Sequence, residues 1–293
     1  MTGATAAATI DRAAADVGIQ AWVHARRLGP DLDEVTRGGD ELVPMASLYK
    51  LPLAACWSDL VADGALDATE RLRVTATQRA PGPTGLAALL DDVEVSQRDA
   101  VRLMLSLSDN AAAEQVLDLV GLDRLSAWLT THGLNRTIVR RGSRDSWSVV
   151  VEETGGGDVG EAPRRLANTD VDVQTSEYNA LLASATTAAD MVTVLGRLWE
   201  AEHHAMVRDS LRLQAWRHRI GSGFPHDDVG VYGKTGTLGR LRHEAAVIEF
   251  PHEHPVAVAV LTKSARPETH QPRVDAAIGA IARAAVTVLR RPL

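Results

Sequence analysis

The chain has 293 residues, of which 45% are hydrophobic and 24% charged, and its formal net charge at pH 7 is −7. This length and composition are ordinary for a globular protein that buries a large core, as one domain or as two interlocked subdomains. The acidic balance, without any dense run of Lys and Arg, argues against nucleic acid and an anionic membrane surface as partners. A small-molecule partner fits this composition better.

The first 18 residues have neither the basic stretch nor the continuous apolar stretch of a signal peptide, and no segment approaches the ~18 apolar residues of a membrane span. We therefore expect a cytoplasmic protein from the sequence as written, and an exported one if a signal peptide has been removed. Cys56, the one cysteine, lies in an apolar run, which predicts a buried and unreactive thiol.

In chain order, the first predicted elements are an Ala-rich helix around residues 9–17, a strand over 19–27 and a turn at 38–40. The middle of the chain is predicted to be helical. Its helices are expected at 96–108, where Ser96 is the N-cap, at 110–121, at 122–133 and at 186–204, where Thr187 and Asp190 have capping-box spacing.

Residues 140–175 interrupt this helical region, because they show no sustained period and contain three consecutive glycines. They predict a long irregular loop, of the kind that is either functional or disordered in a compact domain. No phosphate-binding glycine pattern surrounds residues 155–157, which favours a mobile loop over a phosphate site.

The C-terminal third reads as strands at 229–237, 243–250 and 256–263, followed by a helix over about 272–290. Strands at both ends of the chain with helices between them predict an α/β (α+β) fold, in which helices flank one antiparallel sheet built from both termini. We expect residues 1–46 and 205–293 to form the sheet subdomain. Residues 47–204, including the loop at 140–175, are expected to form an inserted all-helical subdomain of the same structural unit.

Three short motifs carry the chemistry: Ser47-Leu48-Tyr49-Lys50, Ser108-Asp109-Asn110 and Lys234-Thr235-Gly236-Thr237. Each alone is weak evidence. Ser47 could simply cap a helix one turn before a surface lysine, because i and i+3 side chains share a helix face, and Ser-Asp-Asn is often a turn. Together they would place Ser47 at a helix start, Ser108 between two helices and Lys234 on a strand, around a cleft between sheet and helices.

The scarcity of lysine supports a chemical role for two of these residues. Of the 31 basic residues only Lys50, Lys234 and Lys263 are lysines, so the sequence uses arginine wherever a positive charge suffices. Lysine, unlike arginine, loses its proton near neutral pH when it is desolvated or lies beside another cation. Lys50 is therefore better explained as a general base than as a surface charge.

The three motifs in this order match those of penicillin-recognising serine enzymes. Over nearly its whole length the chain resembles the class A serine β-lactamase family and the related penicillin-binding enzymes. This resemblance implies that Ser47 is acylated, that Lys50 takes its proton directly or through water, and that Ser108 relays a proton to the leaving nitrogen. It implies no cofactor and no metal.

The resemblance also implies how the substrate is held. Asn110 would bind the side-chain amide of the substrate, and Lys234 and Thr235 would bind its carboxylate. The backbone N–H groups of Ser47 and Thr237 would form the oxyanion hole. Arg242 is a further candidate for carboxylate binding, although a solvated strand residue is an equally good interpretation.

The sequence departs from the class A pattern in the loop that carries the deacylating Glu. In "TSEYNALL", Glu177 and Asn179 fit the second and third positions of the family motif, and Thr175 occupies the position of the hydrolytic Glu. A threonine cannot act as a carboxylate base, so deacylation is predicted to be slow toward penicillins. Two alternatives stay open: Lys50 serves both half-reactions, or a loop carboxylate replaces the base, with Glu152, Glu153, Glu161 and Glu177 as candidates.

The histidine pairs do not predict a metal site. His203 and His204 end a helix, and His252 and His254 lie in a hairpin-like turn. Neither pair has the i, i+4 spacing with a third ligand that is typical of zinc sites.

These observations favour a β-lactamase-like serine hydrolase that acts on β-lactams or related amide and ester acyl compounds. An esterase or a penicillin-binding-type peptidase on the same fold is the second hypothesis, and the lack of a visible export signal disfavours a cell-wall peptide as substrate. A third hypothesis is a covalent β-lactam receptor or scavenger that is acylated at Ser47 without turnover.

Overall fold

The computed structural model describes residues 3–29, 33–168, 170 and 172–293. At its centre lies a five-stranded antiparallel sheet of strand order β2-β1-β9-β8-β7. The strands are β1 (Ile19–Arg27), β2 (Glu34–Arg37), β7 (Gly230–Leu238), β8 (Leu241–Glu249) and β9 (Val256–Ser264). Because β1 pairs with β9 along its whole length, the predicted sheet built from both ends of the chain is confirmed.

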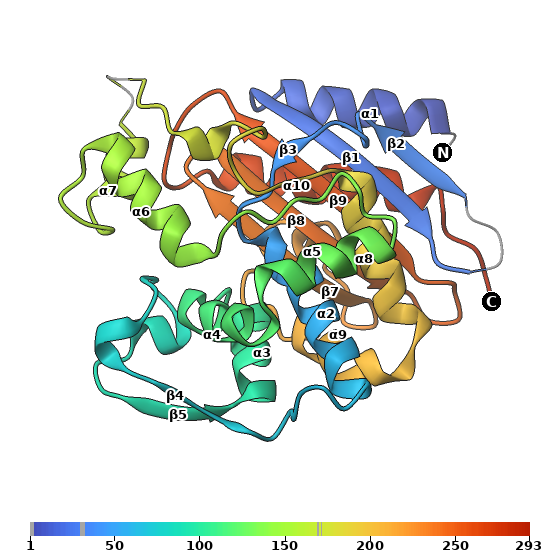
Figure 1. Cartoon of the computed structure of the whole chain (residues 1–293). Helices are drawn as coiled ribbons and strands as arrows, with labels where there is room; N and C mark the ends of the chain where they lie inside the picture. The colour runs from blue at the N-terminus through green and yellow to red at the C-terminus, as the bar shows by residue number, and fades with distance from the viewer. Residues whose placement is uncertain (1–2, 30–32, 169, 171) are drawn as a thin grey trace.

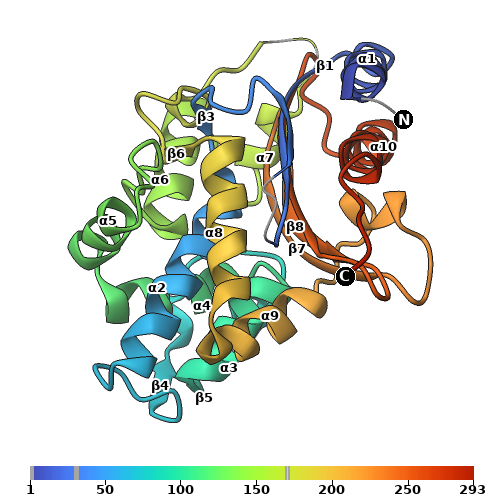
Figure 2. The same cartoon turned by 90° about the vertical axis from the view of Figure 1, so that its right-hand side faces the viewer.

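Helices cover both faces of this sheet. α1 (Gly3–Ala15) and α10 (Pro272–Thr287) lie on one face, and α8 (Ala188–Glu200) lies on the other (Figures 1 and 2). Strand β9 shows why the sequence permits this. Val258 and Val260 belong to the core on the α10 side, and Ala259 and Leu261 to the core on the α8 side. Side chains of successive strand residues point to opposite faces, so an uninterrupted apolar strand fills both cores.

Helices make up most of the regular structure in residues 47–204, but short strands also form there, so the prediction of an all-helical region is wrong in that respect. Its helices are α2 (Lys50–Ala62), α3 (Gln97–Ser106), α4 (Asn110–Val120), α5 (Leu122–Thr131), α6 (Ser143–Thr154) and α7 (Ala162–Leu166), and α9 (Ala205–Arg212) follows α8. The two predicted caps are confirmed: Ser96 Oγ accepts from the Asp99 N–H at 3.2 Å, and Thr187 Oγ1 accepts from the Asp190 N–H at 3.0 Å.

Two small antiparallel pairs were not expected from the sequence, β3 (Val43–Pro44) with β6 (Ala185–Thr186), and β4 (Arg71–Val74) with β5 (Val93–Ser96). The predicted division at residue 205 stays a prediction. α8 packs against β1, β8 and β9, and α9 contacts both α3 and β7, so side chains of the two proposed parts pack together.

The prediction of an irregular loop over 140–175 is wrong in its first two thirds, because α6 and α7 form there. Residues 143–154 contain three consecutive valines and several short polar residues, whose weak helix propensity hides the helical period. In the fold, buried Val150 and the partly buried Trp147 and Val151 pack together with Leu166 of α7. Gly155 ends α6 in the left-handed conformation at φ 63°, which glycine adopts without steric cost.

Asp109 fixes the start of α4, the helix that begins with Asn110. Its fully buried carboxylate accepts from the N–H groups of Ala111 and Ala112 in α4, at 3.0 and 3.2 Å. It also accepts from Leu86 and Ala87, at 2.5 and 3.3 Å, in the 3₁₀ turn Gly85–Ala88. One side chain therefore caps a helix and ties a distant turn to it.

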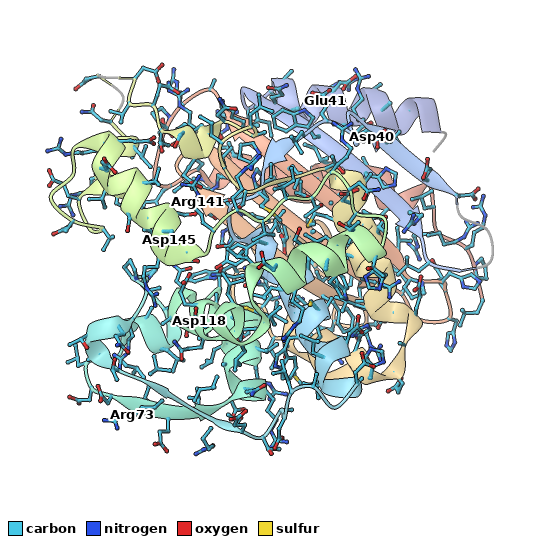
Figure 3. All side chains as sticks on the ribbon, in the orientation of Figure 1. Asp40, Glu41, Arg73, Asp118, Arg141 and Asp145 are labelled. Carbon is cyan, nitrogen blue, oxygen red and sulfur yellow. The ribbon has the colours of Figure 1, made fainter. Side chains whose placement is uncertain are left out.

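We predict that Asp109→Ala lowers the free energy of unfolding by roughly 2–4 kcal/mol, because it leaves several buried N–H groups without an acceptor. Urea denaturation of the purified protein measures this loss. Asp118→Ala is the matched control, since Asp118 is exposed on the same helix (Figure 3) and should change stability by no more than about 0.5 kcal/mol. Equal stability of the two variants would contradict the prediction.

Candidate active site

The three motifs meet at a cavity of about 460 Å³ between the sheet and the helices. Its lining includes Ser47 from the first motif, Ser108 and Asn110 from the second, and Thr235 and Thr237 from the third. These residues come from the segment before α2, the turn between α3 and α4, and strand β7. The cavity is large enough for a small-molecule ligand.

Ser47 lies in a 3₁₀ turn, Ala46–Tyr49, directly before α2, rather than in the first turn of the α-helix as predicted. Ala46 adopts a positive φ of 45°, a conformation that is uncommon for a residue other than glycine. Ser47 caps no helix, and its Oγ makes no hydrogen bond to any residue that the structure describes. The hydroxyl lines the cavity, so the interpretation of Ser47 as a simple helix cap is wrong.

Strand β7 and the turn around Ser47 are held in close contact. A Cβ at Gly236 would lie 3.1 Å from the Met45 carbonyl oxygen and 3.3 Å from Leu48 Cγ, so glycine allows the strand to approach. On β8, His243 accepts at Nδ1 from the Thr262 N–H, which leaves Nε2–H to donate to the Pro44 carbonyl at 2.9 Å. The sheet thereby fixes the backbone that precedes Ser47.

Lys50 is fully buried in the first turn of α2. Its Nζ donates to the Ser108 carbonyl at 2.7 Å and to Asn110 Oδ1 at 2.8 Å. Burial lowers the pKa of Lys50 to about 7, although the carboxylates of Asp109 and Glu114 oppose this shift. Close to neutral pH a substantial fraction of Lys50 is therefore the uncharged amine, the form that can accept a proton.

Ser108 connects the two buried lysines. Lys234, also fully buried, donates to Ser108 Oγ at 2.8 Å, while Lys50 donates to the carbonyl of the same residue. Ser108 has a positive φ of 57°, and such strained backbone is often found at functional sites. Burial, together with the neighbouring Lys50 and Arg219 cations, lowers the pKa of Lys234 well below its ordinary value.

Asn110 lines the cavity, and both ends of its amide are engaged within the protein. Oδ1 accepts from Lys50, and Nδ2 donates to the Pro81 carbonyl at 2.7 Å. The second N–H of the amide is the group that remains for a ligand.

Arg242 also lines the cavity, but its guanidinium donates two hydrogen bonds to Asp275, at 2.9 and 2.7 Å. It is buried, so the alternative of a solvated strand residue is wrong. Asp275 also accepts from Arg219 Nε at 2.9 Å. One carboxylate thus serves two guanidinium groups.

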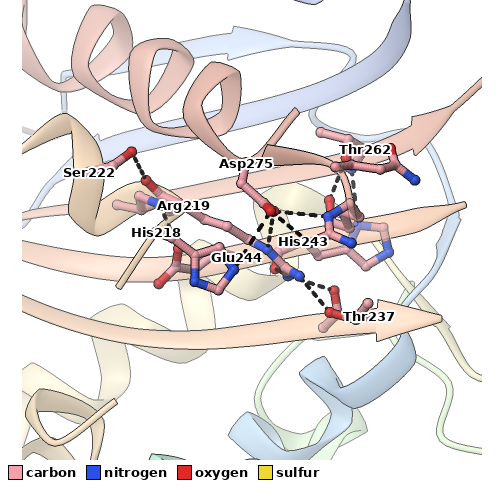
Figure 4. Close-up of polar contacts among 12 residues, drawn as sticks. His218, Arg219, Ser222, Thr237, His243, Glu244, Thr262 and Asp275 are labelled. Atoms are coloured by element: carbon pink, nitrogen blue, oxygen red, sulfur yellow. Dashed lines mark hydrogen bonds and ion pairs between the residues drawn. The ribbon is translucent and has the colours of Figure 1, made fainter. Parts of the chain in front are cut away.

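Arg219, which the sequence analysis did not single out, is the second arginine of this network. It is buried, and its Nη2 donates to Thr237 Oγ1 at 2.6 Å, while its Nη1 donates to the carbonyls of Gly236 and His243 (Figure 4). It joins this wall of the cavity from the segment between α9 and β7. No motif surrounds it in the sequence, so only its position in the fold identifies it.

The three loop residues that the sequence aligned with the family motif point to different surroundings, and only one of them lines the cavity. Thr175 is buried and donates its hydroxyl proton to Glu153 Oε2 at 2.6 Å, outside the lining of the cavity. Asn179 is exposed, and its side chain accepts from the Leu181 N–H. Glu177 is buried and lines the cavity together with Ser47.

Glu177 is the one member of the four candidate loop carboxylates that lines this cavity. Its Oε1 lies 3.5 Å from Arg141 Nε and accepts no hydrogen bond from the residues that the structure describes. Arg141 lies just before α6 (Figure 3). Burial raises the pKa of Glu177, although Arg141 opposes this shift. A buried carboxylate that lines the same cavity as Ser47 is well placed to accept a proton from a water there.

A second cavity of about 460 Å³ shares Pro83, Trp147, Thr237, Leu238, Arg242 and Thr269 with the first. Its remaining lining is mostly apolar and includes Pro81, Val159, Pro163 and Leu166. The site therefore has a polar part that contains Ser47 and an apolar extension beneath α7.

Within the described parts of the chain, none of the helices combines the length and the hydropathy needed to cross a membrane.

Comparison with known proteins places this geometry in a family. Residues 5–289 match the model of the beta-lactamase enzyme family. A "Beta-lactamase regulatory protein BlaB" from Streptomyces cacaoi is 28% identical over 269 residues, which cover 83% of this chain and 85% of that protein.

Solved structures share the fold. A beta-lactamase from Sphaerobacter thermophilus superposes with a TM-score of 0.78 at 24% identity, covering 99% of this chain and 97% of the other. A single-residue mutant of PBP-A, solved as an acyl-enzyme complex with penicillin G, gives 0.74 at 18% identity, covering 96% and 94%. Because the family model matches nearly the entire chain, the protein belongs to the beta-lactamase enzyme family.

Proposed function

We propose that the protein is a serine acyl hydrolase that opens β-lactams, or related amide and ester acyl compounds, through an acyl-enzyme on Ser47. The observation that carries this proposal is the fully buried Lys50, whose pKa is lowered to about 7, one helical turn after the cavity-lining Ser47. Membership of the beta-lactamase enzyme family supports the reaction class.

In acylation, Ser47 Oγ forms a bond to the acyl carbon while its proton passes to Lys50, directly or through a water. A neutral amine has two N–H bonds, and Lys50 uses both on Ser108 and Asn110, which leaves the nitrogen lone pair for this proton. The acyl C–N or C–O bond then breaks. The proton that Lys50 took from Ser47 is relayed through the Ser108 hydroxyl to the leaving atom, so that Lys50 is neutral again and Ser108 keeps a proton. Lys234 holds the Ser108 hydroxyl in place by donating to Oγ.

In this proposal, the substrate carboxylate is bound by residues in and near strand β7. Thr235, Thr237 and Arg219 line the cavity and supply hydrogen-bond donors for a carboxylate. Lys234 lies outside this lining, bonded to Ser108, and we assign to it the positive charge that attracts the carboxylate. We assign Arg242 to this group through its shared partner Asp275 rather than through direct contact. The N–H groups of Ser47 and Thr237 form the oxyanion hole, in which one donor is typically worth ~10²–10³ in rate.

For deacylation we propose that Glu177, rather than Thr175, activates the water. Thr175 uses its hydroxyl proton on Glu153 outside the cavity, whereas Glu177 lines the cavity together with Ser47. The raised pKa of Glu177 makes its carboxylate a stronger base once it is ionised. The apolar extension beneath α7 favours substrates with a large apolar acyl side chain.

One specific observation favours the alternative of a covalent receptor. The Streptomyces cacaoi relative is named a regulatory protein of beta-lactamase, and a sensor needs a long-lived adduct rather than fast turnover. A penicillin-binding-type peptidase or an esterase is the other alternative, and the fold shared with PBP-A is compatible with it. Turnover and adduct lifetime distinguish these functions.

We predict that wild-type protein gains the mass of one opened penicillin and that Ser47→Ala gains none. Intact-protein mass spectrometry measures the adduct, with hydrolysis of a chromogenic cephalosporin followed in parallel. Thr269→Ala is the control, because Thr269 lines the same cavity and its side chain takes no part in the proposed reaction; it should gain the same adduct as the wild type. An adduct on Ser47→Ala would refute the proposal.

The acylation rate should rise with pH through about 7, because below the lowered pKa Lys50 carries a proton and cannot take the one from Ser47. Quenched-flow mass spectrometry from about pH 5 to pH 9 would record this profile. Lys50→Arg keeps the charge but cannot lose its proton, so it should acylate ~10²–10⁴ times more slowly at every pH. A profile that is flat across this range contradicts a base role for Lys50.

Glu177→Gln should form the acyl-enzyme at the wild-type rate and lose it ~10²–10⁴ times more slowly, since the amide cannot accept a proton from water. The decay of the adduct by mass spectrometry measures this. Glu153→Gln is the control, because Glu153 bonds to Thr175 outside the cavity. If the adduct of Glu177→Gln decays at the wild-type rate, Glu177 is not the deacylating base, and Lys50 becomes the candidate. A persistent adduct in the wild type would favour the receptor function.

A further inference from the structure

A cluster of three metal-ligating side chains lies at the far end of α2 from the active site. Asp59 is on α2, and His203 and His204 are in the 3₁₀ turn Glu202–His204 between α8 and α9. One ligand atom of each residue lies within 4.8 Å of the others. Asp59 Oδ1 is 2.7 Å from His203 Nε2 and 3.4 Å from His204 Nε2. The sequence offered no third ligand near the two histidines, and the fold provides Asp59.

The hydrogen bonds of Ser58 fix the tautomer of His204. Ser58 Oγ lies 3.1 Å from the His203 carbonyl and 3.0 Å from His204 Nδ1. The carbonyl is only an acceptor, so the single hydroxyl proton goes to it, and Ser58 Oγ must accept from His204 Nδ1–H. The proton of the neutral ring is then on Nδ1, and the Nε2 lone pair faces Asp59 Oδ1.

Two electron-rich atoms thus face each other at 3.4 Å, an arrangement that a cation between them would stabilise. The other carboxylate oxygen of Asp59 accepts from Trp128 Nε1 at 2.7 Å. Ser58 therefore orients His204, and Trp128 orients Asp59, as hydrogen-bond partners of metal ligands do in known metal sites.

We propose that Asp59, His203 and His204 bind a divalent transition-metal ion such as Zn²⁺. Two imidazoles and one carboxylate form a donor set that Zn²⁺ accepts. Ligand atoms about 2.0–2.1 Å from a tetrahedral ion lie about 3.3 Å apart, which matches the contact between Asp59 and His204. The exposed His203 moves outward by roughly half an ångström from its hydrogen-bonded position, and solvent supplies the fourth ligand.

Bound metal would join α2 to the segment between α8 and α9. Asp59 lies about 13 Å along α2 from Lys50, given the rise of an α-helix, so the ion takes no part in the Ser47 chemistry. Its role is to stabilise the position of the helix that carries Lys50. Arg197 and Arg208 lie near His204 and lower the affinity for a cation.

The test uses the untagged, chelator-treated protein and Zn²⁺ alone. Isothermal titration calorimetry should give one Zn²⁺ per chain, and a hundredfold excess over the dissociation constant should raise the Tm by about 5 °C. Co²⁺ should give the visible absorption of a four-coordinate site. His203→Gln, which changes an exposed residue and leaves the core intact, should abolish both effects.

Ser58→Ala should weaken Zn²⁺ binding about 10–100-fold, because the proton of His204 is then no longer held on Nδ1 and can occupy Nε2, the atom that binds the metal. His226→Gln is the matched control, since His226 is an exposed histidine outside the cluster, and it should bind Zn²⁺ as the wild type does. Absence of a one-to-one isotherm in the wild type would overturn the proposal, as would unchanged affinity in His203→Gln. Neither result depends on the activity of Ser47.

Discussion

Lys50 and Lys234 are both fully buried, and both donate hydrogen bonds to Ser108. Removing two neighbouring cations from water costs several kcal/mol each unless acceptors compensate for the lost hydration. Carbonyl, amide and hydroxyl oxygens fill that role here. The same desolvation lowers the pKa of Lys50 to about 7, so burial, which is costly for stability, also produces the neutral amine that the proposed mechanism needs.

The remaining architecture holds these two lysines together. β7 carries Lys234 on a sheet built from both chain ends, and α2 carries Lys50 in the inserted helices. Asp109 caps α4, next to Ser108, which contacts both lysines, and Asn110, which contacts Lys50. His243 bonds the sheet to the backbone before Ser47. Each contact joins segments that are far apart in the sequence, so the site exists only in the folded chain.

In the proposed mechanism, the lifetime of the acyl-enzyme depends on the group beside it. In this chain the choice lies between Glu177 and Thr175, two residues apart at the 3₁₀ turn Ser176–Tyr178. Glu177 lines the cavity, and Thr175 bonds to Glu153 outside it. A change of two positions in the loop can therefore separate a hydrolase from a covalent receptor without any change in the fold.

The fold class and the three motifs could be predicted from the sequence alone, because apolar periodicity and residue type are local properties. The sequence analysis missed α6, where consecutive valines hide the helical period, and it missed Arg219 and the contact of Asp59 with His203. It placed Glu177 in the family motif but could not show that this residue lines the cavity. Which side chains meet is a property of the folded chain, since desolvation, ion pairing and ligand geometry arise between residues that are often separated by a hundred or more positions.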